Sequence, residues 1–487
     1  MKCEHMKRKW LAIGIILLVI GTCIIPAIAQ DTEKPLPSSR GNWLYVGGSG
    51  PNNYTKIQDA INDSSDWDTV FVYHGMYFEN LIINKSIVLI GENKNTTIID
   101  GGGKWSSGNA VRIDSDWVNI SGFTIQNSIK GPFHGIYIYH SCYNTITCTI
   151  IKQNYYGIDV STNSNYNTLS KNIVTNNTYG ITIFYNSNFN DIINNNVTKN
   201  KIGIELFNHS DFNNIINNTI TNNKNGNGIC LDFSNNNTIS SNTILNNYYD
   251  SISLILSDNN TIFDNTITNG FNGILVRYAG NNTISENTIT NNDYNGINIV
   301  HGNSISIINT TIANNNRNGI NIDCGNSISI INNIITNNTF YGIFLVTNLH
   351  SNIINNTISN NVRSGINMTY SDFNTIINNN IVNNNDSGVF LEYSNETDIT
   401  SNNISKNRFG IYIHLSTDNI VRKNNFLKNM KDAFFNTSKE NTWVHNYWNK
   451  TRILPKLIFG QFMVGSIEIS WINIDWRPAL RPYDIGG

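Results

Sequence analysis

The stretch that decides the fold is GITIFYNSNFNDIINNNVTKNKI at residues 180–202, followed at once by GIELFNHSDFNNIINNTITNNKNGN at residues 203–227. Each unit begins with Gly-Ile and later places two apolar β-branched residues five positions apart. The unit recurs about thirteen times between Gly135 and Phe434, at steps of 22 or 23 residues with a single step of 25. A fixed period of this size indicates a solenoid, in which each coil stacks on the one before it.

Within each unit, apolar residues and asparagines are two positions apart, which is the period of a β-strand. Asn190 precedes Ile192 in this way, and Asn195 precedes Val197. We therefore expect three short strands per coil, with isoleucine filling the interior. The asparagines at the corners can bond to one another along the stack as amide ladders, and asparagine also tolerates the left-handed backbone of a tight corner.

The repeat has the length of a leucine-rich repeat, but it lacks leucine at helical spacing, so we predict an all-β parallel β-helix. The turn before the glycine varies in length, from three residues between Asn177 and Gly180 to five between Asn223 and Gly228. A corner that tolerates insertions favours the right-handed form of this fold.

Outside the repeats, residues 1–29 are typical of a secretory signal peptide, with a basic start, an apolar run and the sequence Ala27-Ile28-Ala29. An uncleaved membrane anchor is the alternative. We expect a linker and first strand at 30–54, and the β-helix at 55–434. Its N-terminal cap and irregular coils lie at 55–128 and its regular repeats at 129–434. An aromatic C-terminal cap follows at 435–487. A short helix through Ile57–Ile61, with Thr55 as its N-cap, is predicted to cover the first coil.

Charge and cysteine spacing exclude some classes of function. The formal net charge of −2 lacks the basic excess that nucleic-acid binding requires. A cleaved signal predicts a secreted, periplasmic or cell-surface protein with no remaining transmembrane span. Cys142 and Cys148 lie across one corner and could form a local disulfide, whereas Cys230 and Cys324 lie four coils apart. The absence of a Cys-x-x-Cys pair argues against structural zinc.

A family resemblance rests on IQDAINDSSDWDTVFVYHGMYFENLIINKSIVLIGENKNTTIIDGGG, residues 57–103, and on the Asn-Thr-Ile and Gly-Ile-x-Ile units that follow it. These segments resemble NosD-type periplasmic β-helix proteins, also called carbohydrate-binding and sugar-hydrolysis repeat proteins, over residues 55–435. The resemblance implies a right-handed parallel β-helix like that of pectate lyases. It also implies roles from copper-site maturation to polysaccharide binding or cleavage.

Side chains that point outward from the Gly-Ile strands form two columns in which acids and aromatics concentrate. Aromatic faces stack on sugar rings and carboxylates bond hydroxyl groups, so this face suits an extended glycan. The alternative is an ordinary solvated sheet. The candidate carbohydrate-binding residues are Asp159, Phe184, Glu205, Phe207, Asp232, Phe344, Phe390, Glu392 and Tyr412.

Three functions follow as hypotheses. The first is an exported scaffold that binds carbohydrate or a cell-envelope partner without turning it over. The second is a polysaccharide lyase or glycoside hydrolase, in which Glu205 and Asp232 on adjacent coils act as the carboxylate pair, with Arg277 and Asp323 farther along. The motifs of the polygalacturonase type are missing, which favours binding over cleavage. The third is copper maturation, for which His134 and His140 are the nearest histidine pair. No metal site is predicted, with calcium and copper as alternatives.

Overall fold

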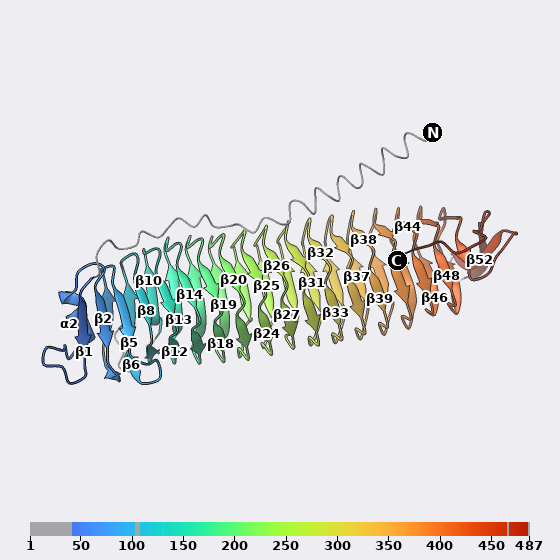
Figure 1. The fold of residues 1–487 in the computed structure, drawn as a ribbon. Helices are drawn as coiled ribbons and strands as arrows, with labels where there is room; N and C mark the ends of the chain where they lie inside the picture. Colours follow the sequence, from blue (N-terminus) through green and yellow to red (C-terminus); the bar gives the residue numbers. More distant parts are fainter. Residues whose placement is uncertain (1–40, 103–107, 130, 465–466, 486–487) are drawn as a thin grey trace. The chain divides into compact units, whose positions relative to one another are not determined.

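The computed structural model describes residues 41–102, 108–129, 131–464 and 467–485. The predicted signal peptide and most of the predicted linker therefore lie outside the described residues. Three parallel β-sheets wind together from the first coil to the last (Figure 1). In the described part of the chain, no helix has the length and apolarity to cross a membrane.

A typical coil runs through β19 (Ile202–Phe207) in sheet C, β20 (Asn214–Ile216) in sheet A and β21 (Thr219–Thr221) in sheet B. Sheet A has 18 strands, from β1 (Trp43–Val46) to β50 (Thr442–Val444), and sheet B extends from β3 (Gly75–Tyr77) to β51 (Tyr447–Trp448). The parallel β-helix is therefore confirmed, but the count of about thirteen coils is wrong. The opening segment and residues 442–448 add strands to the same sheets, although their sequences depart from the repeat.

Sheet C carries the predicted face, and its strands pair in parallel from one coil to the next. Its parallel strands are β4 (Leu81–Ile83), β7 (Val111–Ile113), β10 (His134–Tyr139), β13 (Tyr156–Ser161), β16 (Tyr179–Phe184), β19, β22 (Ile229–Asp232), β25 (Ile252–Ile255), β28 (Ile274–Arg277), β31 (Ile297–Val300), β34 (Ile320–Asp323), β37 (Ile343–Val346), β40 (Ile366–Thr369), β43 (Ser387–Glu392), β46 (Phe409–His414) and β49 (Lys431–Asn436).

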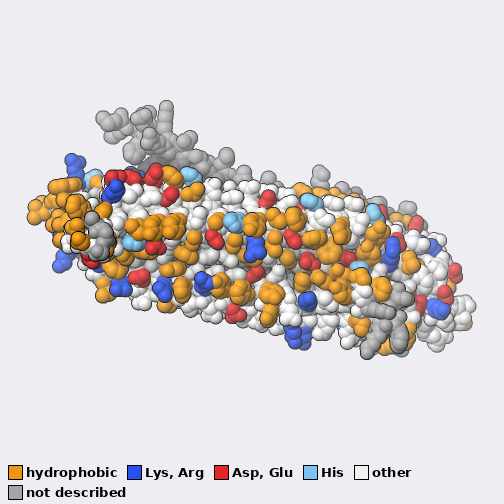
Figure 2. All heavy atoms as spheres, turned by 180° about the vertical axis from the view of Figure 1, so that it is seen from behind, with side chains coloured by type: hydrophobic (Ala, Val, Ile, Leu, Met, Phe, Trp, Pro, Cys, Tyr) orange, Lys and Arg blue, Asp and Glu red, His pale blue; other side chains and the backbone are white. Residues whose placement is uncertain are grey.

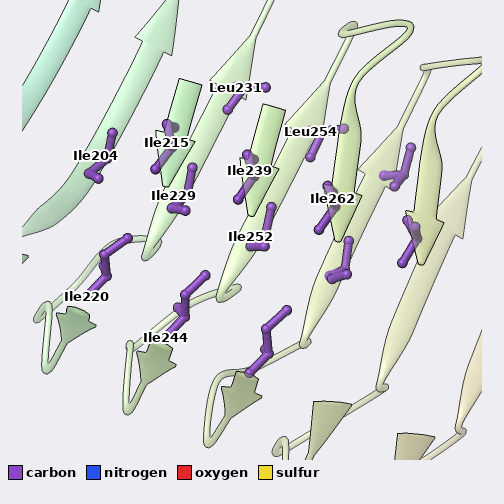
Figure 3. Close-up of a cluster of buried hydrophobic side chains, with 14 of the residues drawn as sticks. Ile204, Ile215, Ile220, Ile229, Leu231, Ile239, Ile244, Ile252, Leu254 and Ile262 are labelled. Atoms are coloured by element: carbon purple, nitrogen blue, oxygen red, sulfur yellow. The ribbon is translucent and has the colours of Figure 1, made fainter. Parts of the chain in front are cut away.

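Isoleucine fills the interior as the period predicts. Ile204, Ile215 and Ile220 of one coil are fully buried, and each lies beside the equivalent isoleucine of the next coil (Figure 3). Because β-branched side chains fit a pleated surface, equivalent residues stack column on column without gaps. The core is therefore a set of continuous apolar columns that can be lengthened coil by coil.

The corner asparagines fall into two kinds. Asn195 is buried: its Oδ1 accepts a hydrogen bond from the backbone N–H of Asn172 at 3.0 Å, and its Nδ2 donates to the carbonyl of Leu169 at 2.8 Å. The preceding residue, Asn194, is exposed and has the left-handed backbone, with φ of 58°. From the sequence, one asparagine was expected both to form the amide ladder and to adopt the left-handed corner. In the structure, Asn195 forms the ladder and Asn194 adopts the corner conformation.

The two ends close differently. Helix α2 (Ile57–Asp63) buries Ile57 and Ile61 against the first coil, as expected. Its N-cap is not Thr55, because the carboxylate of Glu79 accepts the hydrogen bonds of the first helical N–H groups instead, at 2.9 and 3.0 Å. At the other end Trp448 is buried and stacks on Phe426, with ring centroids 4.5 Å apart.

The local disulfide that the sequence allows between Cys142 and Cys148 is absent. Cys142 and Cys148 are both free thiols. Cys142 accepts a hydrogen bond from the backbone N–H of Asn165 in the next coil, and Cys148 accepts one from Thr147. Each sulfur is therefore used within the stack rather than across the corner.

Candidate functional site

The two outward columns of sheet C have the predicted register. Along β19, Ile204 and Leu206 are fully buried, while Glu205 and Phe207 point outward. Glu205 pairs with Cys230 of the next strand, and Phe207 pairs with Asp232. Glu205 and Asp232 are thus diagonal neighbours, one coil and two residues apart, which corresponds to about 8 Å between their backbones.

A third column, which the sequence argument missed, stands beside the first two. It is formed by the residue before each glycine, and in the early coils these residues are His134, Tyr156 and Tyr179. Their rings stack in sequence, with centroids 4.7 and 4.8 Å apart. We call these three residues the aromatic row.

Glycine creates this column. At Gly157 the alternation of the strand is interrupted, so that Tyr156 is partly exposed while Gly157 and Ile158 are both buried. A Cβ atom on Gly157 would lie 2.4 Å from the carbonyl oxygen of Gly180, so only glycine fits. The available sequence signal was the aromatic residue before the glycine, as in Tyr-Gly-Ile at 156–158 and 179–181.

The carboxylate of Asp159, a predicted binding residue, is bonded by two side chains of the protein itself. Its Oδ2 lies 3.0 Å from Nε2 of His134, and its Oδ1 accepts a hydrogen bond from the hydroxyl of Thr182 at 2.9 Å. Only 3% of Asp159 is exposed. Asn109 holds the other ring nitrogen of His134, with its Oδ1 at 2.9 Å from Nδ1. Asp159 therefore positions His134 in the aromatic row.

Glu205 lies two coils beyond Asp159, and its carboxylate differs from that of Asp159 in having no side-chain partner among the described residues. Burial raises the pKa of its carboxyl to about 7, and the nearby charges of Asp232 and Asp159 act in the same direction. Among the described residues no protein group donates a hydrogen bond to this carboxylate. Burial also raises the pKa of Tyr156 and Tyr179, with the Glu205 charge as a further cause, so these two hydroxyls stay protonated. The free carboxyl is therefore available to a ligand.

Rings enclose Glu205 from two sides. The aromatic row lies on one side, and Phe184 and Phe207 of the second column lie on the other, with their centroids 6.0 Å apart. The rings of Tyr156 and Phe184 meet edge to face with centroids 6.1 Å apart, so the two groups of rings are in contact. Burial raises the pKa of Asp232 as well, and its Oδ1 has no hydrogen-bond partner among the described residues. This set, which we call the Glu205 cluster, comprises Tyr156, Tyr179, Phe184, Glu205, Phe207 and Asp232.

The remaining predicted residues lie elsewhere on sheet C. Phe390 and Tyr412 are on adjacent coils, with centroids 5.1 Å apart, and Glu392 pairs with His414. Phe344 lies two coils before Phe390. Seven coil steps separate Asp232 from Glu392, which corresponds to about 34 Å.

The two other catalytic candidates are also separate from the Glu205 cluster. Arg277 lies two coils beyond Asp232, and Asp323 lies two coils beyond Arg277. The predicted face therefore holds two separate groups of aromatic and acidic side chains rather than one continuous site.

The donor set for copper does not come together. His134 begins β10 and His140 directly follows its last residue, so the two are about 20 Å apart along an extended chain. His301 stacks on Tyr278 and His350 on Phe373, in different columns. Copper sites group His, Cys or Met side chains around one point. No three His, Cys, Asp or Glu side chains of the described residues are placed to hold a metal ion, so the residues present do not fit a copper centre.

Comparison with known proteins places this geometry in context. Two curated relatives match parts of the chain: the "Cell surface glycoprotein" of Methanothermus fervidus is 31% identical over 158 residues, and the "Probable pectinesterase/pectinesterase inhibitor 44" of Arabidopsis thaliana is 30% identical over 112 residues. These matches cover 31% and 21% of this chain, but only 23% and 20% of the respective relatives.

Among solved structures, the pre-mature gene product 12 of bacteriophage phi29 superposes with a TM-score of 0.51 at 13% identity. The match covers 84% of this chain and 71% of that one, and it shows a shared fold only.

Two family models cover the repeats. Residues 293–465 match the family described as periplasmic copper-binding protein (NosD), and residues 109–248 and 212–312 match the family described as right handed beta helix region. Together with the stacked coils, these matches, which begin at residue 109, confirm the resemblance inferred from the repeats. Over its repeats the chain is therefore similar to the NosD-type right-handed parallel β-helix proteins.

Proposed function

We propose that this protein is an exported scaffold that binds an extended, neutral carbohydrate chain along sheet C, with the Glu205 cluster as its principal subsite. One observation carries the proposal: a carboxyl group without a protein partner is enclosed by aromatic rings on two sides. Sugar rings present apolar faces to aromatic side chains and hydroxyl groups to carboxyls. The cluster offers both kinds of partner within neighbouring coils.

The charge of the face favours a neutral glycan over a uronate polymer. Between β10 and β25, the three outward columns carry four carboxylates, which are Asp159, Glu205, Asp232 and Asp250, and no lysine or arginine. A polymer with a carboxylate on each sugar would meet like charges at the coils of Glu205, Asp232 and Asp250, whereas Asp159 is paired with His134. An envelope location agrees with the predicted signal peptide and with the name of the Methanothermus relative.

The binding proposal is tested with single variants in a glycan array followed by calorimetry. Tyr179→Ala and Phe207→Ala should each weaken binding about tenfold, the loss expected for one aromatic contact of about 1.4 kcal/mol. Phe373→Ala is the matched control and should leave this binding unchanged, because it removes a ring that is 44% exposed in the turn after β40, outside sheet C. Equal binding by all three variants and the parent protein would remove the Glu205 cluster from the function.

Glycan cleavage is the second candidate, and the pKa of Glu205 is the observation that favours it. A carboxyl with a pKa of about 7 is about half protonated at neutral pH, and its protonated form can deliver the proton to a glycosidic oxygen. The backbones of Glu205 and Asp232 lie about 8 Å apart, which allows their carboxyl groups the separation of about 6.5–9.5 Å found in inverting glycosidases, where the second group activates water. Release of reducing ends from neutral polysaccharides by the parent protein, and its loss in Glu205→Gln, would establish cleavage. Binding without release would leave the scaffold function.

A further inference from the structure

The C-terminal end of the solenoid is closed by a hairpin of β52 (Lys456–Val464) and β53 (Ile467–Asp475). One face of the hairpin packs on the last coil, where Ile458 is buried and the carboxylate of Asp475 accepts hydrogen bonds from Asn446 N–H at 2.9 Å and the Trp448 indole at 3.0 Å. The hairpin is thus fixed at its base.

The opposite face of this hairpin is exposed, and it is apolar near its base, whereas Gln461, Ser470 and Glu468 lie toward its tip. Leu457, Phe459 and Ile472 lie on it, since Phe459 pairs with Ile472 and Leu457 is two residues away. Phe459 is 58% exposed. The terminal unit of a soluble solenoid normally presents a polar outer face, because nothing further stacks on it. Large exposed apolar patches mark sites of contact with proteins or membranes.

The loops that flank the hairpin extend this surface. Lys456 pairs with Asp475, so residues 453–454 and 476–477 both flank the base of the hairpin. Ile453 is 90% exposed and Trp476 is 68% exposed. Figure 2 shows hydrophobic side chains gathered at this end, on the left of the view, with Lys and Arg at its margin. We call the surface formed by Ile453, Leu454, Leu457, Phe459, Ile472 and Trp476 the end patch.

Basic residues flank the hairpin in the sequence, although the chain as a whole has a net charge of −2. Lys450 precedes the hairpin, Arg477 and Arg481 follow it, and all three are exposed. Residues 449–487 contain five Lys and Arg against three Asp and Glu, and one of these acids, Asp475, is buried under the hairpin. The local excess of positive charge is opposite in sign to the rest of the molecule.

We propose that the end patch docks on a lipid bilayer with anionic headgroups. Tryptophan and aliphatic side chains partition into the interface between headgroups and acyl chains, while arginine and lysine contact the phosphates. Each basic residue near an anionic surface contributes about 1 kcal/mol. A second copy of this chain is a poorer occupant, because two facing end patches would bring Arg477 and Arg481 against their own equivalents.

The experiment is vesicle co-sedimentation of the full chain. Residues 1–29 stay in every variant, so that only differences between variants count. One set of vesicles is pure phosphatidylcholine, and the other is an equal mixture of phosphatidylcholine and phosphatidylglycerol. The parent protein should bind the mixed vesicles more tightly. Arg477→Gln/Arg481→Gln should bind them at least tenfold more weakly, and Trp476→Ser should bind both sets more weakly.

Controls are available on the same molecule. Tyr248→Ser removes an aromatic ring that is 62% exposed on a distant coil, and Lys171→Gln/Lys199→Gln removes two exposed charges on other coils far from the hairpin. Both controls should bind like the parent protein, and circular dichroism should show the same β-structure for every variant. If Trp476→Ser and Arg477→Gln/Arg481→Gln bind like the parent, the proposal is wrong. If these variants instead abolish self-association in sedimentation velocity and leave vesicle binding unchanged, the end patch is a contact between copies and the lipid proposal is overturned.

Discussion

Replacing Glu205 with Gln should stabilise the protein at alkaline pH and leave its stability unchanged at acid pH. The carboxyl pKa is about 7 in the folded protein, against an ordinary value of 4.5. Between these two values the folded state keeps a proton that the unfolded chain loses. The contribution of Glu205 to stability therefore falls as pH rises from 4.5 to 7, and it stays at its lowest level above 7.

The size of the effect follows from the two pKa values. A difference from 4.5 to about 7 corresponds to at most about 3 kcal/mol, at about 1.4 kcal/mol for each tenfold change in the proton equilibrium. Glutamine has the same shape and no charge, so it avoids this penalty at every pH. The variant should gain up to about 3 kcal/mol over the parent protein at pH 8 and nothing at pH 4.

Urea unfolding of both proteins at the two pH values measures this difference, since other titrating groups cancel in the comparison. Glu286→Gln, at an exposed corner, is the control and should give the same difference from the parent at both pH values. Hydrogen exchange of the amides in β19 reports the same effect locally, because the coils of a solenoid contact only their neighbours. If Glu205→Gln shows no greater gain at pH 8 than at pH 4, then Glu205 is not held in a desolvated site and the proposed subsite loses its basis.

Two further predictions concern the scaffold. Asn195→Ala should destabilise the protein by about 3 kcal/mol, because it removes the side-chain partners of the Asn172 N–H and the Leu169 carbonyl. Asn194→Ala should destabilise it by only about 1 kcal/mol, the cost of placing alanine in a left-handed backbone. Urea unfolding measures both losses of stability, and equal losses would contradict the division of tasks between the two asparagines. Asp475→Asn should lower the free energy of unfolding by about 2 kcal/mol, because it weakens the bonds to the Asn446 N–H and the Trp448 indole. Limited proteolysis should then cleave residues 453–480 while the coils stay resistant. Equal cleavage of the hairpin and the coils would contradict a local role for Asp475.

The coils were predictable because a solenoid repeats one local rule. Period-two spacing around Ile192 and Val197, written many times at a fixed step, determines strands, interior and register together. The register then follows by counting, which is why Glu205 and Asp232 were correctly placed on adjacent coils. The first and last coils were harder to count, because their sequences do not carry the repeat.

The Glu205 cluster was only half predictable, and Gly157 shows why. Strict alternation would point Tyr156 and Ile158 to the same side, whereas the close approach of Gly157 to Gly180 reverses the direction of Tyr156. The aromatic row was lost from the prediction for this reason. The burial of Glu205 was lost with it, since Tyr156 and Tyr179 lie beside that carboxyl. The pKa of Glu205 depends on the side chains packed around its carboxyl, and the prediction from sequence did not include the column that holds Tyr156 and Tyr179.

Asp159 and Glu205 stand in one column of one sheet, yet the protein treats them differently. His134 and Thr182 bond Asp159, so its burial is compensated within the fold. Glu205 has no such partner, and its charge lowers stability at neutral pH. Later coils carry asparagine at the equivalent position, as at Asn298 and Asn321, so the fold itself does not require an acid there. Functional sites commonly keep residues that the scaffold would be more stable without. The absence of a structural role is therefore the reason to look for a ligand at Glu205, while Asp159 belongs to the framework that holds the aromatic row in place.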